Sequence, residues 1–140
     1  MRPIDRLIGQ YAESHRHPTN VLIHWVCVPI IVWCVLALLY WLHPYAAYVG
    51  VAAGLVYYAT LSLPMALAML LFSAACLLSF AYVPYLLWVA IALFVITWIF
   101  QFIGHEIEGK KPSFLDDVRF LLIGPIFLLA KAFRKAGVAF

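Results

Sequence analysis

Long uncharged segments separated by short polar turns dominate the chain, and this pattern predicts helices that cross a membrane. Between Arg16 and Glu106 there is no Asp, Glu, Lys or Arg. A helix needs about 20 apolar residues to cross a hydrocarbon core of roughly 30 Å, so the stretch has room for four closely connected spans. We predict spans at about 20–42, 45–61, 65–80 and 85–105. The second and third are short enough to form a re-entrant hairpin instead.

Prolines mark the predicted breaks between the spans. Pro44, Pro64 and Pro84 each stand at the start of a predicted span. Proline suits the first turn of a helix, where its missing N–H is not needed, and disfavours a continuing helix. The breaks are therefore predicted to be short turns without extra domains.

The segment after the fourth predicted span has a different, amphipathic pattern. Ser113 followed by Asp116 resembles a capping box that would start a new helix, and Gly124-Pro125 would interrupt that helix. Apolar and basic residues alternate beyond the interruption, so we predict an interfacial helix over 113–136 that is too short to span. The expected fold class is an all-α, polytopic integral membrane protein: a single membrane domain over 1–140 with four transmembrane helices and a C-terminal amphipathic interfacial helix.

Composition supports the membrane class, and charge gives an orientation. The chain is 67% hydrophobic and 11% charged, with a mean hydropathy of +1.03, which excludes a soluble domain because such a fold would lack a polar surface. The basic residues flanking the predicted spans are Arg2, Arg6 and Arg16 before the first, and Lys110, Lys111, Arg119, Lys131, Arg134 and Lys135 after the last. Positive charge collects on the cytoplasmic side. We therefore expect both termini in the cytoplasm, which requires an even number of spans.

Four of the five histidines are predicted at the cytoplasmic ends of the spans. His15 and His17 precede the first span, His24 lies about one turn inside it, and His105 closes the fourth. His43 ends the first span on the opposite side. At about 1.5 Å of rise per residue, nearly a full bilayer separates His43 from His24, so His43 cannot join the others.

Polar residues near these histidines share helix faces. Gln101, His105 and Glu108 are spaced i, i+4 and i+7, and Asn20 and His24 share a face of the first span in the same way. Ionisable groups in a span are costly and usually face a bundle interior, a cavity or each other. Histidine with carboxylate is a common ligand set for a catalytic first-row metal. The pattern favours a metal site, although histidines that only cap helices and contact headgroups remain an alternative.

Lys110 and Lys111 allow two interpretations. They are either positive-inside anchors that touch anionic headgroups or a docking point for a substrate carboxylate. No glycine-rich phosphate loop, nucleophile elbow or CxxC pair occurs, and nucleic acid is excluded as a partner.

The spacing of these polar residues resembles a known family. The pattern consists of Tyr11, His15, Asn20, His24 and Pro29, then Gln101, Gly104, His105, Glu108 and Pro112, then Gly124-Pro125. It resembles the Mpo-type membrane 2-hydroxy fatty acid dioxygenase family, long catalogued as a domain of unknown function. The resemblance implies an iron(II)-dependent enzyme of fatty acid α-oxidation, which uses O₂ to convert a long-chain 2-hydroxy fatty acid into the acid one carbon shorter, with loss of CO₂.

The resemblance also implies roles for individual residues. The expected iron ligands are His15, His24 and His105, with Glu108 or His17 as the fourth. Asn20, Gln101 and Glu108 would orient ligands or bond the bound substrate. The expected substrate contacts are Tyr11, Lys110 and Lys111. The hydroxyl and carboxylate of the substrate would chelate the iron, and the acyl chain would lie among the spans beside membrane lipid.

The sequence allows more than one cellular location and more than one function. The short loops look more like a bacterial member, which implies the inner membrane; a eukaryotic member would lie in the endoplasmic reticulum membrane. A haem-binding membrane electron carrier and a non-catalytic lipid-binding membrane protein are the competing functions. A haem absorption band would indicate the first, and absence of metal after anaerobic purification the second.

The predicted topology is testable by itself. Reporter fusions to each end of the chain should both report the cytoplasm, because the basic residues lie only in the two segments that flank the uncharged stretch. Ends found on opposite sides of the membrane would refute four spans and would separate His24 from His105.

Overall fold

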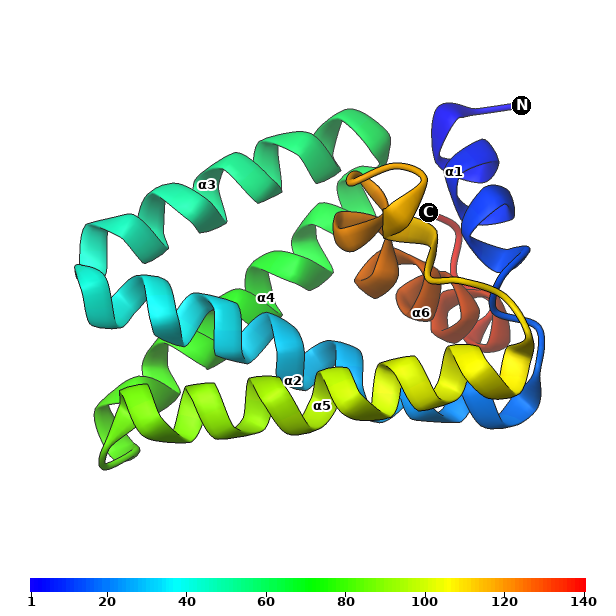
Figure 1. Cartoon of the computed structure of the whole chain (residues 1–140). Coiled ribbons are helices and arrows are strands. Elements are labelled where there is room, and N and C mark those ends of the chain that lie inside the picture. The colour runs from blue at the N-terminus through cyan, green and yellow to red at the C-terminus, as the bar shows by residue number, and fades with distance from the viewer. The chain divides into compact units, whose positions relative to one another are not determined.

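The computed structural model describes residues 1–140, and its only regular elements are helices (Figure 1). The elements are α1 (Pro3–Ala12), α2 (Pro18–Leu42), α3 (Pro44–Leu61), α4 (Leu63–Ser79), the 3₁₀ turn η1 (Phe80–Tyr82), α5 (Leu86–Glu108), the 3₁₀ turn η2 (Ser113–Leu115) and α6 (Phe120–Ala136). The all-α prediction is confirmed.

Caps and prolines set the helix starts, close to the predicted breaks. Pro44 lies in the first turn of α3, where the Nδ1 atom of His43 accepts a hydrogen bond from the Tyr45 backbone N–H at 3.1 Å. At the start of α4 the Ser62 hydroxyl accepts from the Met65 N–H at 3.4 Å. Each cap satisfies an N–H group that a helix start leaves without a partner.

Three helical stretches are long and apolar enough to cross a membrane. They are Pro18–Leu42, Leu63–Tyr82 and Leu86–Glu108, with mean hydropathies of 2.6, 2.1 and 2.4. Helix α3 is not among them, since its tyrosines and glycines lower its hydropathy. The structure is therefore all-α with three candidate spans, and a fourth span at α3 stays a prediction.

The chain divides into two compact units. One comprises Met1–Pro29 and Trp98–Phe140, the other Ile30–Thr97, and α2 and α5 run from one unit into the other. In the second unit, α3 packs against α4. Its buried core is formed by Leu36, Ala37, Cys76, Phe80 and Ala90.

The first unit pairs the two ends of the chain. Helix α1 lies beside α6 (Figure 1). The buried side chains of α1 are Ile4, Leu7, Ile8 and Tyr11. Those of α6 include Ile123, Ile126, Phe127 and Leu128. Burial of these apolar side chains between α1 and α6 holds α1 in place.

Two predicted features of the C-terminal segment are wrong. Ser113 starts only a 3₁₀ turn, and its hydroxyl bonds to the Ser14 hydroxyl at 2.5 Å instead of capping a helix. Gly124-Pro125 does not interrupt the helix either, because α6 runs unbroken from Phe120 to Ala136. Proline removes one helical hydrogen bond, and burial of the apolar side chains on both sides of it offsets that loss. Placement of this segment in the membrane interface stays a prediction.

Helices α2 and α5 approach each other closely in the first unit. A Cβ atom on Gly104 would lie 2.4 Å from Oδ1 of Asn20 and 3.4 Å from Cδ1 of Ile23. Real Cβ atoms do not tolerate the shorter distance, so any larger residue at position 104 would require the buried Asn20 side chain to move. The contact brings the neighbouring residue His105 to the face of α2 that carries Asn20 and His24.

Candidate metal centre

Three histidines from three different segments converge in the first unit. His15 lies in the turn between α1 and α2, His24 lies in α2, and His105 lies near the end of α5. All three are buried, and their possible ligand atoms lie within 4.8 Å of one another. Their ring centroids are 4.3, 4.8 and 5.1 Å apart, and the ring planes are close to perpendicular. Sequence analysis selected these same three residues as metal ligands.

Backbone carbonyls determine which nitrogen of two rings carries the proton. The Nδ1 atom of His15 lies 2.6 Å from the carbonyl oxygen of Tyr11, and Nδ1 of His24 lies 2.9 Å from that of Asn20. A carbonyl only accepts hydrogen bonds, so each Nδ1 donates. The Nε2 atom of each ring is left with a free lone pair, which is the arrangement of a metal-binding histidine.

The two free nitrogens face each other at a distance that fits one metal ion. Nε2 of His15 lies 3.0 Å from Nε2 of His24, and with both Nδ1 atoms protonated either a further proton or a metal ion between the two nitrogens would make this contact attractive. Metal–imidazole bonds are about 2.1 Å long. Two such bonds at about 90° place their nitrogens about 3.0 Å apart, so the pair fits adjacent positions on one ion.

The remaining properties of the cluster agree with metal binding. The Nδ1 atom of His105 is buried without a hydrogen-bond partner, which is rare for a buried polar atom and would be resolved by a bound cation. Burial and the neighbouring His24 imidazole lower the pKa of His15 to about 3. The His15 ring is therefore neutral near pH 7, and neutral imidazole is the form that binds metals.

His15 is held from several sides although it is not in a helix. The Tyr11 ring stacks on its imidazole with a centroid separation of 3.9 Å and an interplanar angle of 5°. The Ser14 hydroxyl lies 3.1 Å from Nδ1 of His15 and 2.5 Å from the Ser113 hydroxyl. These contacts fix the ring through α1 on one side and η2 on the other.

Glu108 ties the His15 turn to the end of α5. Its Oε1 atom accepts hydrogen bonds from the backbone N–H groups of Arg16 and His17, both at 2.7 Å, and from Nδ2 of Asn20 at 3.3 Å. Hydrogen bonds to a carboxylate are short and strong. The structure thus places Glu108 as an anchor of the turn, outside the group of three histidines.

The other two predicted polar residues are buried beside the cluster. Asn20 is fully buried, and its Nδ2 donates to the Ser14 carbonyl at 3.2 Å as well as to Glu108. Oδ1 of Asn20 and Oε1 of Gln101 have no hydrogen-bond partner. Two buried acceptors without donors are suited to a ligand that brings a hydroxyl group.

His17 lies outside the cluster. Its side chain is exposed, and its Nδ1 atom accepts a hydrogen bond from the Thr19 N–H at 3.2 Å. The structure therefore gives the His17 side chain a capping contact at the start of α2.

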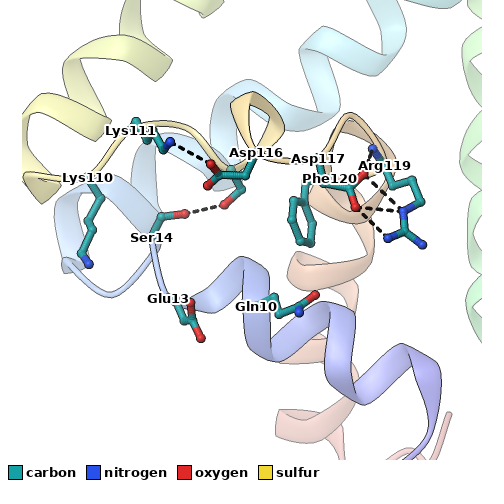
Figure 2. Close-up of a pocket in the computed structure, with 10 residues that line it drawn as sticks. Gln10, Glu13, Ser14, Lys110, Lys111, Asp116, Asp117, Arg119 and Phe120 are labelled. Atoms are coloured by element: carbon teal, nitrogen blue, oxygen red, sulfur yellow. Dashed lines mark hydrogen bonds and ion pairs between the residues drawn. The ribbon is translucent and has the colours of Figure 1, made fainter.

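Lys110 and Lys111 line a separate polar cavity of about 480 Å³ (Figure 2). Lys111 forms an ion pair with Asp116 at 2.7 Å, and Arg119 pairs with Asp117 at 2.7 Å. Ser14 lines this cavity and also contacts His15. The cavity and the histidine cluster thus share one wall at Ser14. Sequence analysis missed Ser14, because no spacing rule pairs it with a residue as distant as Ser113.

Comparison with known proteins gives one consistent result. Residues 1–136 match a protein family described as 2-hydroxy-palmitic acid dioxygenase Mpo1-like. The chain is 31% identical over 141 residues to the 2-hydroxy-palmitic acid dioxygenase MPO1 of Saccharomyces cerevisiae, and the match covers 93% of this chain and 79% of the yeast protein. No solved structure gives a significant match.

The anchoring role of Glu108 predicts different outcomes for two substitutions. Glu108→Gln keeps an oxygen that accepts both backbone N–H groups, so its metal affinity should stay within about tenfold of the parent. Glu108→Ala frees the turn that carries His15 and should lower the affinity by about 10- to 100-fold. Competition titrations with a chelator measure both values. Complete loss of metal in Glu108→Gln would instead identify Glu108 as a ligand.

Proposed function

The chain belongs to the 2-hydroxy-palmitic acid dioxygenase Mpo1-like family, and we propose that it is an iron(II)-dependent dioxygenase of fatty acid α-oxidation. The substrates are a long-chain 2-hydroxy fatty acid and O₂. The products are the fatty acid one carbon shorter, CO₂ and water. The buried group of His15, His24 and His105 is the observation that supports this proposal most directly.

The reaction balances without any further co-substrate. One 2-hydroxy acid, R–CH(OH)–COOH, and one O₂ give R–COOH, CO₂ and H₂O. The bond between C1 and C2 breaks, C1 leaves as CO₂, and C2 becomes the new carboxyl carbon. The substrate supplies all four electrons that reduce O₂, so no external reductant is required.

A redox-active ion suits this chemistry better than zinc, which does not change its oxidation state. A ferrous ion held by His15, His24 and His105 would supply the reactivity toward O₂ that no side chain provides. Three protein ligands would leave further positions on the ion open for small molecules, as in catalytic metal sites generally. The Tyr11 and Asn20 carbonyls orient two of the imidazoles, and Glu108 holds the turn that carries His15.

Two buried acceptors support recognition of the substrate hydroxyl. We assign this role to Oε1 of Gln101 and Oδ1 of Asn20, which lack donors. A site built to bond a hydroxyl rejects an analogue without it, because the buried acceptor is then left unpaired. This arrangement favours 2-hydroxy acids over unsubstituted fatty acids.

Lys110, Lys111 and Tyr11, the expected substrate contacts, have different surroundings. Lys111 is neutralised by Asp116, so Lys110 is the better partner for a substrate carboxylate. Tyr11 is buried and stacked on His15, and it supports that ligand instead of contacting the acyl chain. The acyl chain of the substrate would lie among the membrane-spanning helices, which offer it an apolar environment similar to that of the bilayer.

The membrane context of the proposal follows from the three apolar helices. With α3 as a fourth span, both termini would lie in the cytoplasm. The inner membrane is the expected location in a bacterium, and the endoplasmic reticulum membrane in a eukaryote.

The geometry disfavours a haem carrier. Two axial ligands on opposite faces of a haem lie about 4 Å apart, twice the length of a metal–nitrogen bond. The facing nitrogens of His15 and His24 are closer, at 3.0 Å, and the third imidazole fills the adjacent space. A non-catalytic lipid-binding protein is the remaining alternative, and a metal-free protein after anaerobic purification would favour it.

Alanine substitutions of the three histidines test the proposal. His15→Ala, His24→Ala and His105→Ala should each lose iron and O₂ uptake with 2-hydroxypalmitate, because removal of one ligand leaves too few to hold the ion. The variants should still insert into membranes, since apolar helices determine insertion. Iron content and O₂ uptake are measured on anaerobically purified protein.

His43→Ala is the matched control for these variants. His43 caps α3 through its Nδ1 atom and is not in the cluster, so its loss should leave iron content and activity as in the parent. Full activity in any two of the three cluster variants would show that these histidines do not form the metal site.

A further inference from the structure

We propose that α6 positions the metal ligand His15 although it contributes no ligand itself, and that Tyr11 transmits the constraint from Gly124 to the His15 imidazole. This inference rests on the proposed metal centre and does not depend on the reaction. It gives a function to Gly124, whose place in an unbroken helix the sequence did not explain.

Tyr11 controls His15 through two independent contacts. Its ring stacks on the imidazole at 3.9 Å and nearly parallel, which fixes the plane of the ring. Its carbonyl oxygen accepts the Nδ1 proton at 2.6 Å, which fixes the rotation and leaves Nε2 toward the metal site. Because His15 lies in a turn, no helix holds its backbone in place. A displacement of Tyr11 therefore displaces the ligand.

Helix α6 in turn encloses the Tyr11 ring. Phe127 packs against it with a centroid separation of 5.0 Å, and Phe120 lies at 6.2 Å. A Cβ atom on Gly124 would lie 3.2 Å from the Tyr11 hydroxyl oxygen and 3.9 Å from its Cζ. The tip of the tyrosine is thus seated against the bare backbone of α6.

At Gly124 a side chain would be limited by space and not by backbone conformation. The glycines with positive φ are Gly109 and Gly137, and Gly124 has ordinary helical geometry. A methyl group there would press on the tyrosine hydroxyl. This oxygen lies on the axis of ring rotation, so a ring flip cannot relieve the contact. The Tyr11 ring or α1 must therefore give way by a few tenths of an ångström, and either movement disturbs the stack on His15.

Cobalt(II) affinity, measured by visible absorption titration, tests this role without using enzyme activity. Gly124→Ala should weaken cobalt binding by about tenfold, the lower end of the range for residues that support a ligand. Alanine favours a helix over glycine, so the substitution should not unfold α6. Gly9→Ala is the matched control, since no atom lies within 4 Å of its Cβ position in α1, and it should bind cobalt as the parent does.

Removing the opposing oxygen should reverse the defect. In the double variant Gly124→Ala/Tyr11→Phe the clash is gone while the stacked ring and the carbonyl remain, so cobalt affinity should rise again toward the parent value. Equal affinity of Gly124→Ala and the parent, or a defect that Tyr11→Phe does not relieve, would overturn the inference.

A second pair of variants decides the question if Gly124→Ala does not fold. Tyr11→Leu removes the ring that stacks on His15, whereas Tyr11→Phe keeps it. Cobalt binding should be weaker in Tyr11→Leu than in Tyr11→Phe, and equal affinities would contradict the positioning role. A parent protein that binds no cobalt would overturn the proposed metal centre, an outcome distinct from a failure confined to the variants.

Discussion

Three imidazoles brought together away from water form the constraint on which the first unit depends. Two of their nitrogens face each other at 3.0 Å with free lone pairs, an arrangement that is repulsive unless a cation occupies the space between them. The surrounding contacts hold the imidazole rings close together despite this repulsion. Carbonyls fix the rings from one side, Glu108 closes the turn, and α6 supports Tyr11. Metal binding and folding of this unit should therefore stabilise each other.

Two of the three histidines lie on helices, and the third lies in a turn. His24 and His105 lie on α2 and α5, whose close approach is set by the bare backbone of Gly104 against Asn20. His15 is the one proposed ligand that lies in a turn, and it receives most of the supporting contacts. A ligand in a turn adapts its position more readily than one in a helix. It also depends more on its neighbours, which agrees with the contacts that Tyr11 and Ser14 make with it.

The sequence predicted helical features well because helix periodicity is local. The spacing of Gln101 and His105 and the uncharged stretch required no tertiary information, and the prolines located the breaks. The hydrogen bonds of Glu108 to the backbone N–H groups of Arg16 and His17 were not predictable, since they depend on how this turn folds back to α5. Ser14 and Ser113 meet only through tertiary structure. Helix α6 continues through Pro125 because burial outweighs one lost hydrogen bond.

Iron K-edge X-ray absorption on anaerobically purified protein would show whether three histidines hold a redox-active iron. We expect outer-shell scattering from about three imidazoles and iron–nitrogen distances of about 2.1 Å, as His15, His24 and His105 require. A protein that retains no iron, or a spectrum without imidazole scattering, would show that these histidines do not hold iron.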